Sequence, residues 1–157
     1  MKRIVKINED IIKELVKESV KRIIKEEISN DVDNNIIALI SYLHNCQKQL
    51  REIHWNTRTN ALHSVTDESI GNVLNWEDTL AEAFIGDRDI KLTITDKKPS
   101  VDGYTANDFI SIMKELSELA STVKENISGN KDYDAIAAVV DEIEETSNKL
   151  MYRGNMS

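Results

Sequence analysis

The chain has 157 residues, a net charge of −8 and a single cysteine, Cys46. This length suits one domain that can bury a core without a disulfide or a metal ion as a staple. One proline and five glycines are too few turn residues for a many-stranded protein, so the composition predicts an all-α fold. The lone cysteine excludes an internal disulfide. With no signal peptide and no run of about 20 apolar residues, the sequence favours a cytoplasmic protein that does not enter a membrane.

The negative charge is not spread evenly along the chain. Residues 1–25 carry eight lysines and arginines against four acidic residues, so the rest of the chain has a net charge of about −12. Such a body repels polyanions. We therefore expect no DNA binding except through the N-terminal segment, and basic residues interleaved with acidic ones along a helix more often form an ordinary solvated face.

The first half of the chain predicts two helices separated by a polar break. Asn8 can cap a helix over residues 9–28, whose apolar stripe has helical spacing and consists of Ile12, Val16, Val20, Ile23 and Ile24. The polar segment 29–35, SNDVDNN, is expected to end this helix. A second helix over residues 36–56 follows. Its inward-facing residues are Ile36, Leu39, Ile40, Leu43, Leu50 and Ile53.

Three more helices are predicted in the second half, over residues 61–85, 105–127 and 133–152. Thr105 and Asp108 resemble a capping box at the start of one of them. Residues 86–104 form the longest connection and include a β-like alternation, IKLTIT. We therefore divide the chain into an N-terminal basic amphipathic helix with its linker, residues 1–35, and a four-helix bundle, residues 36–157. One long crossover of this kind matches ferritin-like bundles.

The helix over residues 61–85 carries the pattern that bears on function. His63, Asp67, Asp78 and Glu82 stand at spacings of 4, 11 and 4 residues. At about 100° per residue, they fall within a sector of about 100° on one face of the helix. With a rise of about 1.5 Å per residue, Asp67 and Asp78 are roughly 16 Å apart, whereas metal ligands sit about 2 Å from the ion. One chain therefore cannot complete a metal site with these four residues.

A second copy of the chain can complete it. If this helix packs antiparallel against a two-fold copy of itself, the histidine end of one helix meets the carboxylate end of the other. The axis then falls near residues 72–73, and Gly71 on the same face permits close contact. A mixed set of imidazole and carboxylate ligands suits ferrous iron, with zinc as a substitute. Taken alone, the four residues are more typical of an acidic helix face in solvent, which is the commonest place for Asp and Glu on a helix.

Two motifs resemble the Dps-type miniferritins of the ferritin superfamily. The first is Leu-His63, followed by Asp67 and by DTLAE, residues 78–82, which is similar to the helix-B signature of that family. The second is HWN, residues 54–56, which resembles the family's His-Trp-Asn element. The resemblance covers residues 36–86 well and the last two helices only by pattern.

The resemblance implies a ferritin-like four-helix bundle with a long B–C crossover, to which this chain adds an N-terminal amphipathic helix. It also implies an iron site between two subunits. In that site, the ligands of one chain, His54, His63 and Asp67, face Asp78 and Glu82 of its two-fold mate. The two histidines stand nine residues apart here, which is closer than is usual in the family, so the connecting loop is shorter.

The function implied by the resemblance is that of a ferroxidase. Ferrous iron would be oxidised by peroxide or dioxygen at a dinuclear site and stored as ferric mineral in a hollow oligomer built on two-fold dimers, expected to be a dodecamer. No catalytic residue is expected beyond the metal ligands. The alternative is a non-enzymatic Dps-like assembly protein that has lost iron turnover, and the shorter loop and the added N-terminal helix motivate it.

Four other residues carry expectations of their own. Cys46 lies among apolar helical residues and is predicted to be a buried, unreactive thiol. Trp55 is predicted to be a core aromatic that anchors its helix end, and Trp76 to pack in the bundle or in the dimer seam. His44 does not share a helix face with His54. It is expected to be a structural or surface histidine.

Overall fold

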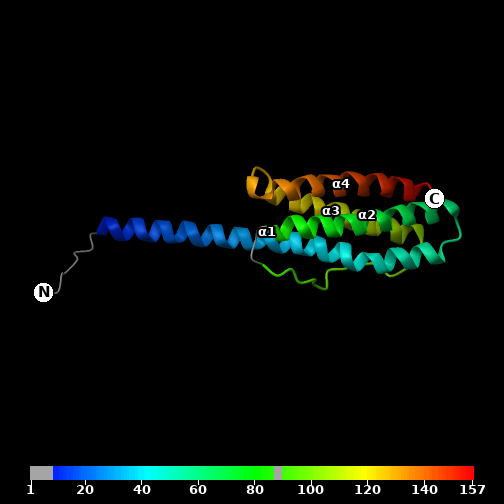
Figure 1. Cartoon of the computed structure of the whole chain (residues 1–157), viewed down its shortest axis with the longest axis horizontal. Coiled ribbons are helices and arrows are strands. Elements are labelled where there is room, and N and C mark those ends of the chain that lie inside the picture. The colour runs from blue at the N-terminus through cyan, green and yellow to red at the C-terminus, as the bar shows by residue number, and fades with distance from the viewer. Residues whose placement is uncertain (1–8, 87–89) are drawn as a thin grey trace. The chain divides into compact units, whose positions relative to one another are not determined.

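The computed structural model describes residues 9–86 and 90–157, and within them every regular element is helical. The helices are α1 (Glu9–Asn56), α2 (Asn60–Ile85), α3 (Ala106–Ile127) and α4 (Asp134–Asn155), with a short 3₁₀ helix, η1 (Lys131–Tyr133), before α4 (Figure 1). The all-α prediction is confirmed. None of the helices in the described ranges has an apolar stretch that could span a bilayer.

α1 is continuous through the segment that we expected to end the first helix. Residues 29–35 are helical, so the prediction of two separate helices over residues 9–28 and 36–56 is wrong. The segment contains neither glycine nor proline, and each serine, asparagine or aspartate costs only up to about 0.7 kcal/mol relative to alanine. A helix already formed on both sides needs no new nucleus to cross such a stretch. The expected cap at Asn8 lies outside the described residues.

Although α1 is continuous, the chain divides into two compact units, residues 1–33 and residues 34–157. The described part of the first unit, residues 9–33, is helical throughout. Its aliphatic side chains between Ile11 and Ile28 are about half exposed. This helix therefore has no hydrophobic core of its own.

The second unit is a helical bundle built from residues 34–56 of α1 together with α2, α3 and α4. α4 packs along α3 and also contacts α2. The largest fully buried side chains are Trp76, Tyr42, Phe84 and Phe109. α2 and α3 run in the same direction (Figure 1), so the chain must return along the bundle between them.

The returning segment has neither helix nor strand in its described residues, 90–105. It is held by side chains of α1. The Thr95 N–H donates to Ser41 Oγ over 2.9 Å, and Asn45 Nδ2 donates to the carbonyl oxygens of Thr95 and Lys97 over 2.9 and 2.8 Å. The β-like alternation of IKLTIT therefore makes no strand here, because helix side chains satisfy backbone groups that a neighbouring strand would otherwise bind.

The helix ends follow their capping residues. The predicted capping box is present: the Thr105 N–H donates to Asp108 Oδ2 over 2.8 Å, and the Asp108 N–H donates to Thr105 Oγ1 over 3.3 Å. α2 begins after the N-cap Thr59 and ends before Gly86, whose φ of 40° suits glycine. α4 ends at Asn155, three residues beyond the predicted residue 152.

The expectations for single core residues have mixed outcomes. Cys46 and Trp76 are buried, as predicted, and Trp76 Nε1 donates to Glu142 Oε1 over 3.1 Å. Trp55 is not a core residue, because 71% of it is exposed. It lies in the last turn of α1, next to the short loop that leads to α2, and its neighbour Asn56 is exposed as well.

Candidate metal centre

Two histidines meet where α1 turns into α2. The connection is only three residues long, 57–59, and the Thr57 N–H donates to the Ile53 carbonyl over 2.9 Å. This tight turn places His54, near the end of α1, against His63, in the first turn of α2. The two imidazole rings are stacked, with centroids 3.9 Å apart and planes inclined by 26°.

The hydrogen bonds of the two rings define their tautomers. His54 Nδ1 lies 3.3 Å from the carbonyl oxygen of His63, and His63 Nδ1 lies 3.2 Å from the carbonyl oxygen of His54. A carbonyl oxygen only accepts, so in both bonds Nδ1 carries the hydrogen and donates. In the neutral rings each Nε2 then keeps its lone pair, which is the arrangement that a metal-binding histidine needs.

Asp67 is the third residue at this end of α2. Its Oδ1 lies 4.0 Å from His54 Nε2, and its side chain is 75% exposed, whereas that of His54 is 17% exposed. A solvated carboxylate therefore stands beside a largely covered imidazole nitrogen. Within residues 9–86 and 90–157 of one chain, however, no group of three or more His, Cys, Asp or Glu is placed to hold a metal ion.

Asp78 and Glu82 lie on the same helix, eleven and fifteen residues after Asp67, and both are exposed. In the described part of the chain, no cation is paired with either carboxylate. The structure does not bring them to the histidines within one chain, since the rise of a helix separates Asp67 and Asp78 by roughly 16 Å. They form a separate acidic end on α2.

The surface between the two ends of α2 is open. Gly71 is exposed, and a Cβ atom built there would meet no atom within 4 Å. Leu74 is 42% exposed, although it is an aliphatic residue in the middle of a bundle helix. The face that carries the four spaced residues thus has polar ends and an apolar, uncovered centre.

Glu68, next to Asp67, is engaged elsewhere. Its Oε2 lies 2.6 Å from Nη1 of Arg153, in the last turn of α4, and both side chains are nearly half exposed. The pair ties α4 to the histidine end of α2 and leaves Asp67 as the available carboxylate. Nothing in the spacing of the sequence indicates this pair, because the two residues are 85 positions apart.

A second polar cluster, which sequence reasoning missed, connects α1 with α2. His44 Nδ1 lies 2.6 Å from Glu77 Oε1, and Gln47 Nε2 donates to Glu77 Oε2. His44 and Gln47 stand three residues apart on α1, so their shared face was the available signal. Glu77 is therefore already held within the chain, whereas its neighbour Asp78 is exposed.

Cys46 has no place in this chemistry. Burial raises the pKa of its thiol, and the nearby charge of Glu77 adds to that effect. Its Sγ donates to the Leu43 carbonyl over 3.4 Å. A buried thiol that stays protonated is neither a nucleophile nor a metal ligand.

Of the five ligands that the sequence indicates, His54 lies next to both His63 and Asp67, without the three forming a metal-holding group in the described part of one chain, and Asp78 and Glu82 lie apart from them. The structure adds the ring stacking and the orientation of both imidazoles, which no spacing could have indicated. No protein-family model, curated protein or solved structure matches this chain.

Proposed function

We propose that this protein is a ferritin-like, Dps-type iron protein that binds ferrous iron between two copies of the chain and oxidises it. His54, His63 and Asp67 of one copy and Asp78 and Glu82 of its mate are the ligands. The observation that carries the proposal is the orientation of the two imidazoles. Both Nδ1 atoms are committed to backbone carbonyls, so both Nε2 atoms are free to bind a metal ion.

The open face of α2 supports the two-copy arrangement. The axis relating two antiparallel α2 helices passes near Gly71, where there is space for a second backbone. Leu74, 42% exposed in the single chain, would become covered there. The acidic end of the mate would then supply the two carboxylates that the histidine end lacks.

The connectivity of the bundle also supports the proposal. Four helices with parallel second and third members and one long crossover (Figure 1) are the arrangement of ferritin-like folds. Fold alone does not define an activity. The connectivity therefore supports the ferritin-like part of the proposal, while the iron site between two chains rests on the two histidines and the open face of α2.

The chemistry follows from the donor set. Imidazole nitrogen binds the divalent ion, while carboxylate oxygens favour the ferric product, so the mixed set stabilises iron as it is oxidised. Two ferrous ions would each give one electron to peroxide, which is reduced to water, and dioxygen is the alternative oxidant. The five residues bind and orient the iron. Ferric iron would then be stored inside a hollow oligomer, for which a dodecamer is the expected form.

The same stacked histidines favour a second candidate function. Each ring bonds to the backbone of the other residue, so the pair also acts as a clasp that closes the α1–α2 turn. A protein in which this clasp is purely structural would be a non-enzymatic assembly with a Dps-like bundle. The two functions differ in whether the free Nε2 atoms bind iron.

Mixing two inactive variants tests the proposed site. One variant is His63→Ala with Asp67→Asn, and the other is Asp78→Asn with Glu82→Gln. Each alone should lose at least about tenfold in ferrous affinity and its peroxide-dependent oxidation. When the two are co-expressed, a mixed dimer holds one complete site and one that lacks all four side chains, so about a quarter of the wild-type sites should return.

Three outcomes decide between the functions. Recovery on mixing supports a site shared by two chains, because a site within one chain would gain nothing. Activity that is lost in each variant and does not return overturns the shared site. A wild-type assembly that neither binds nor oxidises ferrous iron overturns the iron function and favours the structural clasp. Glu125→Gln, an exposed carboxylate on α3, is the control for Glu82→Gln and should change nothing.

A further inference from the structure

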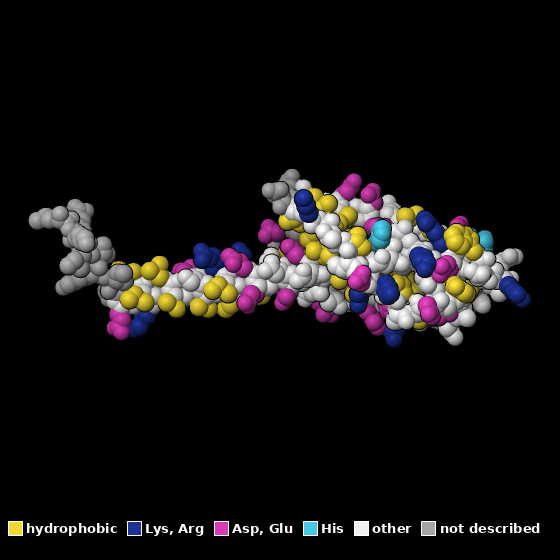
Figure 2. All heavy atoms as spheres, turned by 90° about the horizontal axis from the view of Figure 1, so that it is seen from below, with side chains coloured by type: hydrophobic (Ala, Val, Ile, Leu, Met, Phe, Trp, Pro, Cys, Tyr) yellow, Lys and Arg dark blue, Asp and Glu magenta, His cyan; other side chains and the backbone are white. Residues whose placement is uncertain are grey.

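The helix of the first unit exposes more apolar surface than a solvated helix normally does. Eight aliphatic side chains between Ile11 and Ile28 are each between 48% and 61% exposed. Figure 2 shows hydrophobic side chains gathered along this part of α1. They follow rows with a spacing of four residues, such as Ile12, Val16 and Val20, so they form one continuous stripe. We call these eight residues the N-terminal stripe.

Such a stripe needs a partner. Hydrophobic patches of more than a few hundred Å² are rare on proteins that act alone, and they mark interaction surfaces. In proteins, most of the stability of an amphipathic helix comes from the packing of its apolar face. The second unit has its own buried core. The aliphatic residues of the N-terminal stripe are not part of that core.

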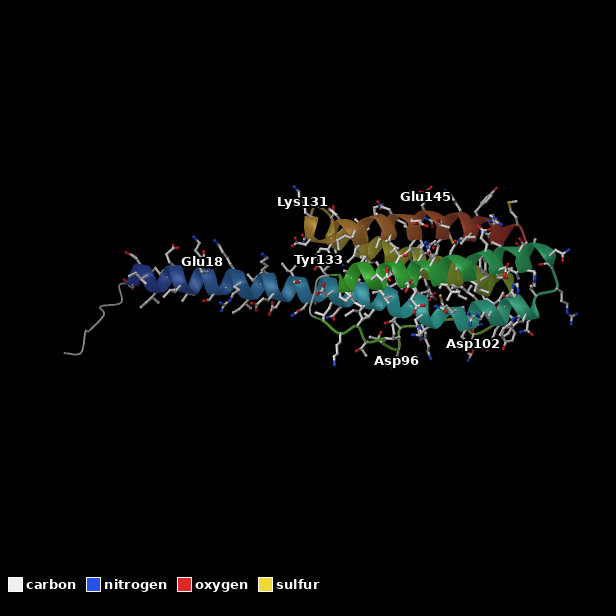
Figure 3. All side chains as sticks on the ribbon, in the orientation of Figure 1. Glu18, Asp96, Asp102, Lys131, Tyr133 and Glu145 are labelled. Atoms are coloured by element: carbon white, nitrogen blue, oxygen red, sulfur yellow. The ribbon has the colours of Figure 1, made fainter. Side chains whose placement is uncertain are left out.

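The charges around the N-terminal stripe argue against a polyanion or an anionic membrane as the partner. Residues 1–33 carry eight basic and eight acidic residues and so have no net charge. Lys21 pairs with Glu18 over 3.4 Å and Arg22 with Glu26 over 3.9 Å, all on the same helix. Glu18 projects from the helix surface (Figure 3). The eight residues of the N-terminal stripe are all aliphatic, whereas helices that lie in a membrane interface combine aromatic residues with a basic face.

We propose that the N-terminal stripe packs against the same stripe of a second copy of the chain. Eight half-exposed aliphatic side chains amount to several hundred Å² per chain, the order of the ~800 Å² per partner that a stable interface buries. Residues 34–157 have a net charge of −8 and residues 1–33 have none. The first units of two copies can therefore meet without net charge repulsion between them.

This surface is separate from the open face of α2. The α2 face would pair two chains around an iron site, whereas the N-terminal stripe has no metal-ligating role. A chain with two self-associating surfaces builds assemblies larger than a dimer. The N-terminal stripe therefore sets the size of the assembly, independently of iron.

Light-scattering mass measurements on full-length protein test this inference. Val16→Gln with Ile23→Gln places two glutamines near the centre of the N-terminal stripe, because the two positions differ by only about 20° around the helix. The matched control, Glu14→Gln with Lys25→Gln, places two glutamines about 160–180° from Val16 and leaves the net charge unchanged. The stripe variant should have at most half the wild-type mass at the same concentration, while the control keeps it.

The outcomes separate this inference from the iron function. A halved mass with ferrous binding retained supports the inference, and so does a halved mass in a protein that never bound iron. An unchanged mass in the stripe variant overturns it, even if iron binding is intact. A wild-type monomer also overturns it. If that monomer sediments with phosphatidylserine vesicles and the stripe variant does not, the partner is a lipid surface.

Discussion

The two halves of α1 have the same kind of sequence and opposite environments. Between Ile11 and Ile28 the aliphatic side chains are about half exposed. In residues 34–56 the aliphatic side chains at helical spacing are fully buried; they include Ile36, Leu39, Ile40, Leu43, Leu50 and Ile53. Hydrophobic spacing therefore predicts which face of a helix needs a partner and leaves open whether that partner comes from the same chain.

The polar residues of the two halves differ in the same way. In the second half, Ser41 and Asn45 bind the returning segment of the chain, and Tyr42 OH lies 3.0 Å from Glu115 Oε2 on α3. In the first half, the ion pairs connect neighbouring turns of one helix. Polar groups that reach other elements mark the half that belongs to a packed unit.

One substitution made in both halves should give the largest contrast. Leu43→Ala removes a fully buried side chain and should lower the free energy of unfolding of the second unit by about 2–5 kcal/mol. Leu15→Ala, at a residue that is 61% exposed, should change it by less than about 0.5 kcal/mol. Urea unfolding followed by tryptophan fluorescence reports the second unit, which contains both tryptophans. Equal losses in dilute protein would contradict the contrast between the halves.

The buried thiol of Cys46 should make the stability depend on pH, whereas a thiol introduced in the exposed first half should not. Burial raises the pKa of Cys46 above its ordinary value of 9.0. The unfolded chain then releases the thiol proton at a lower pH than the folded chain. The contribution of the protonated Cys46 thiol to folding stability is therefore complete below pH 9.0 and is lost as the pH rises above it. The loss between about pH 8 and 10 should be about 1.4 kcal/mol.

Two variants isolate that effect. Cys46→Ala should remove the decline over this range, because no buried thiol remains. Ser19→Cys adds a thiol at an exposed position of the first half and should leave the decline as it is in the wild type. A decline that persists in Cys46→Ala would assign it to another group. Tyr42, whose pKa burial also raises above its ordinary value of 10.0, adds to the decline mainly above pH 10.

Much of the second unit could be predicted from local chemistry. Thr105 and Asp108 set the start of α3, and Gly86 ends α2, because caps and glycines act within one turn of the chain. The continuity of α1 could not be predicted in this way. The polar run at residues 29–35 weakens a helix without breaking it. Whether these residues are helical therefore depends on the helices that flank them on both sides.

In the candidate site, too, some features could be predicted from the local sequence and others could not. Spacing on α2 indicated that His63, Asp67, Asp78 and Glu82 share a face, since helix geometry is periodic. The stacking of His54 on His63 depends on the length of the α1–α2 turn and on two hydrogen bonds from the imidazoles to backbone carbonyls across that turn. The exposure of Trp55 depends on where the bundle ends. Neither is a property of the local sequence.

The smallest expected effect concerns the ion pair of the first half. Lys21 Nζ lies 3.4 Å from Glu18 Oε1, and the side chains are 64% and 67% exposed. Glu18→Gln should weaken the helix around these residues by a few tenths of a kcal/mol, because water and salt screen exposed charges. Amide hydrogen exchange at low and high salt would measure it, with Glu14→Gln as the control. A loss above about 1 kcal/mol would mean that a partner removes water from this pair, which would make the first half resemble the second.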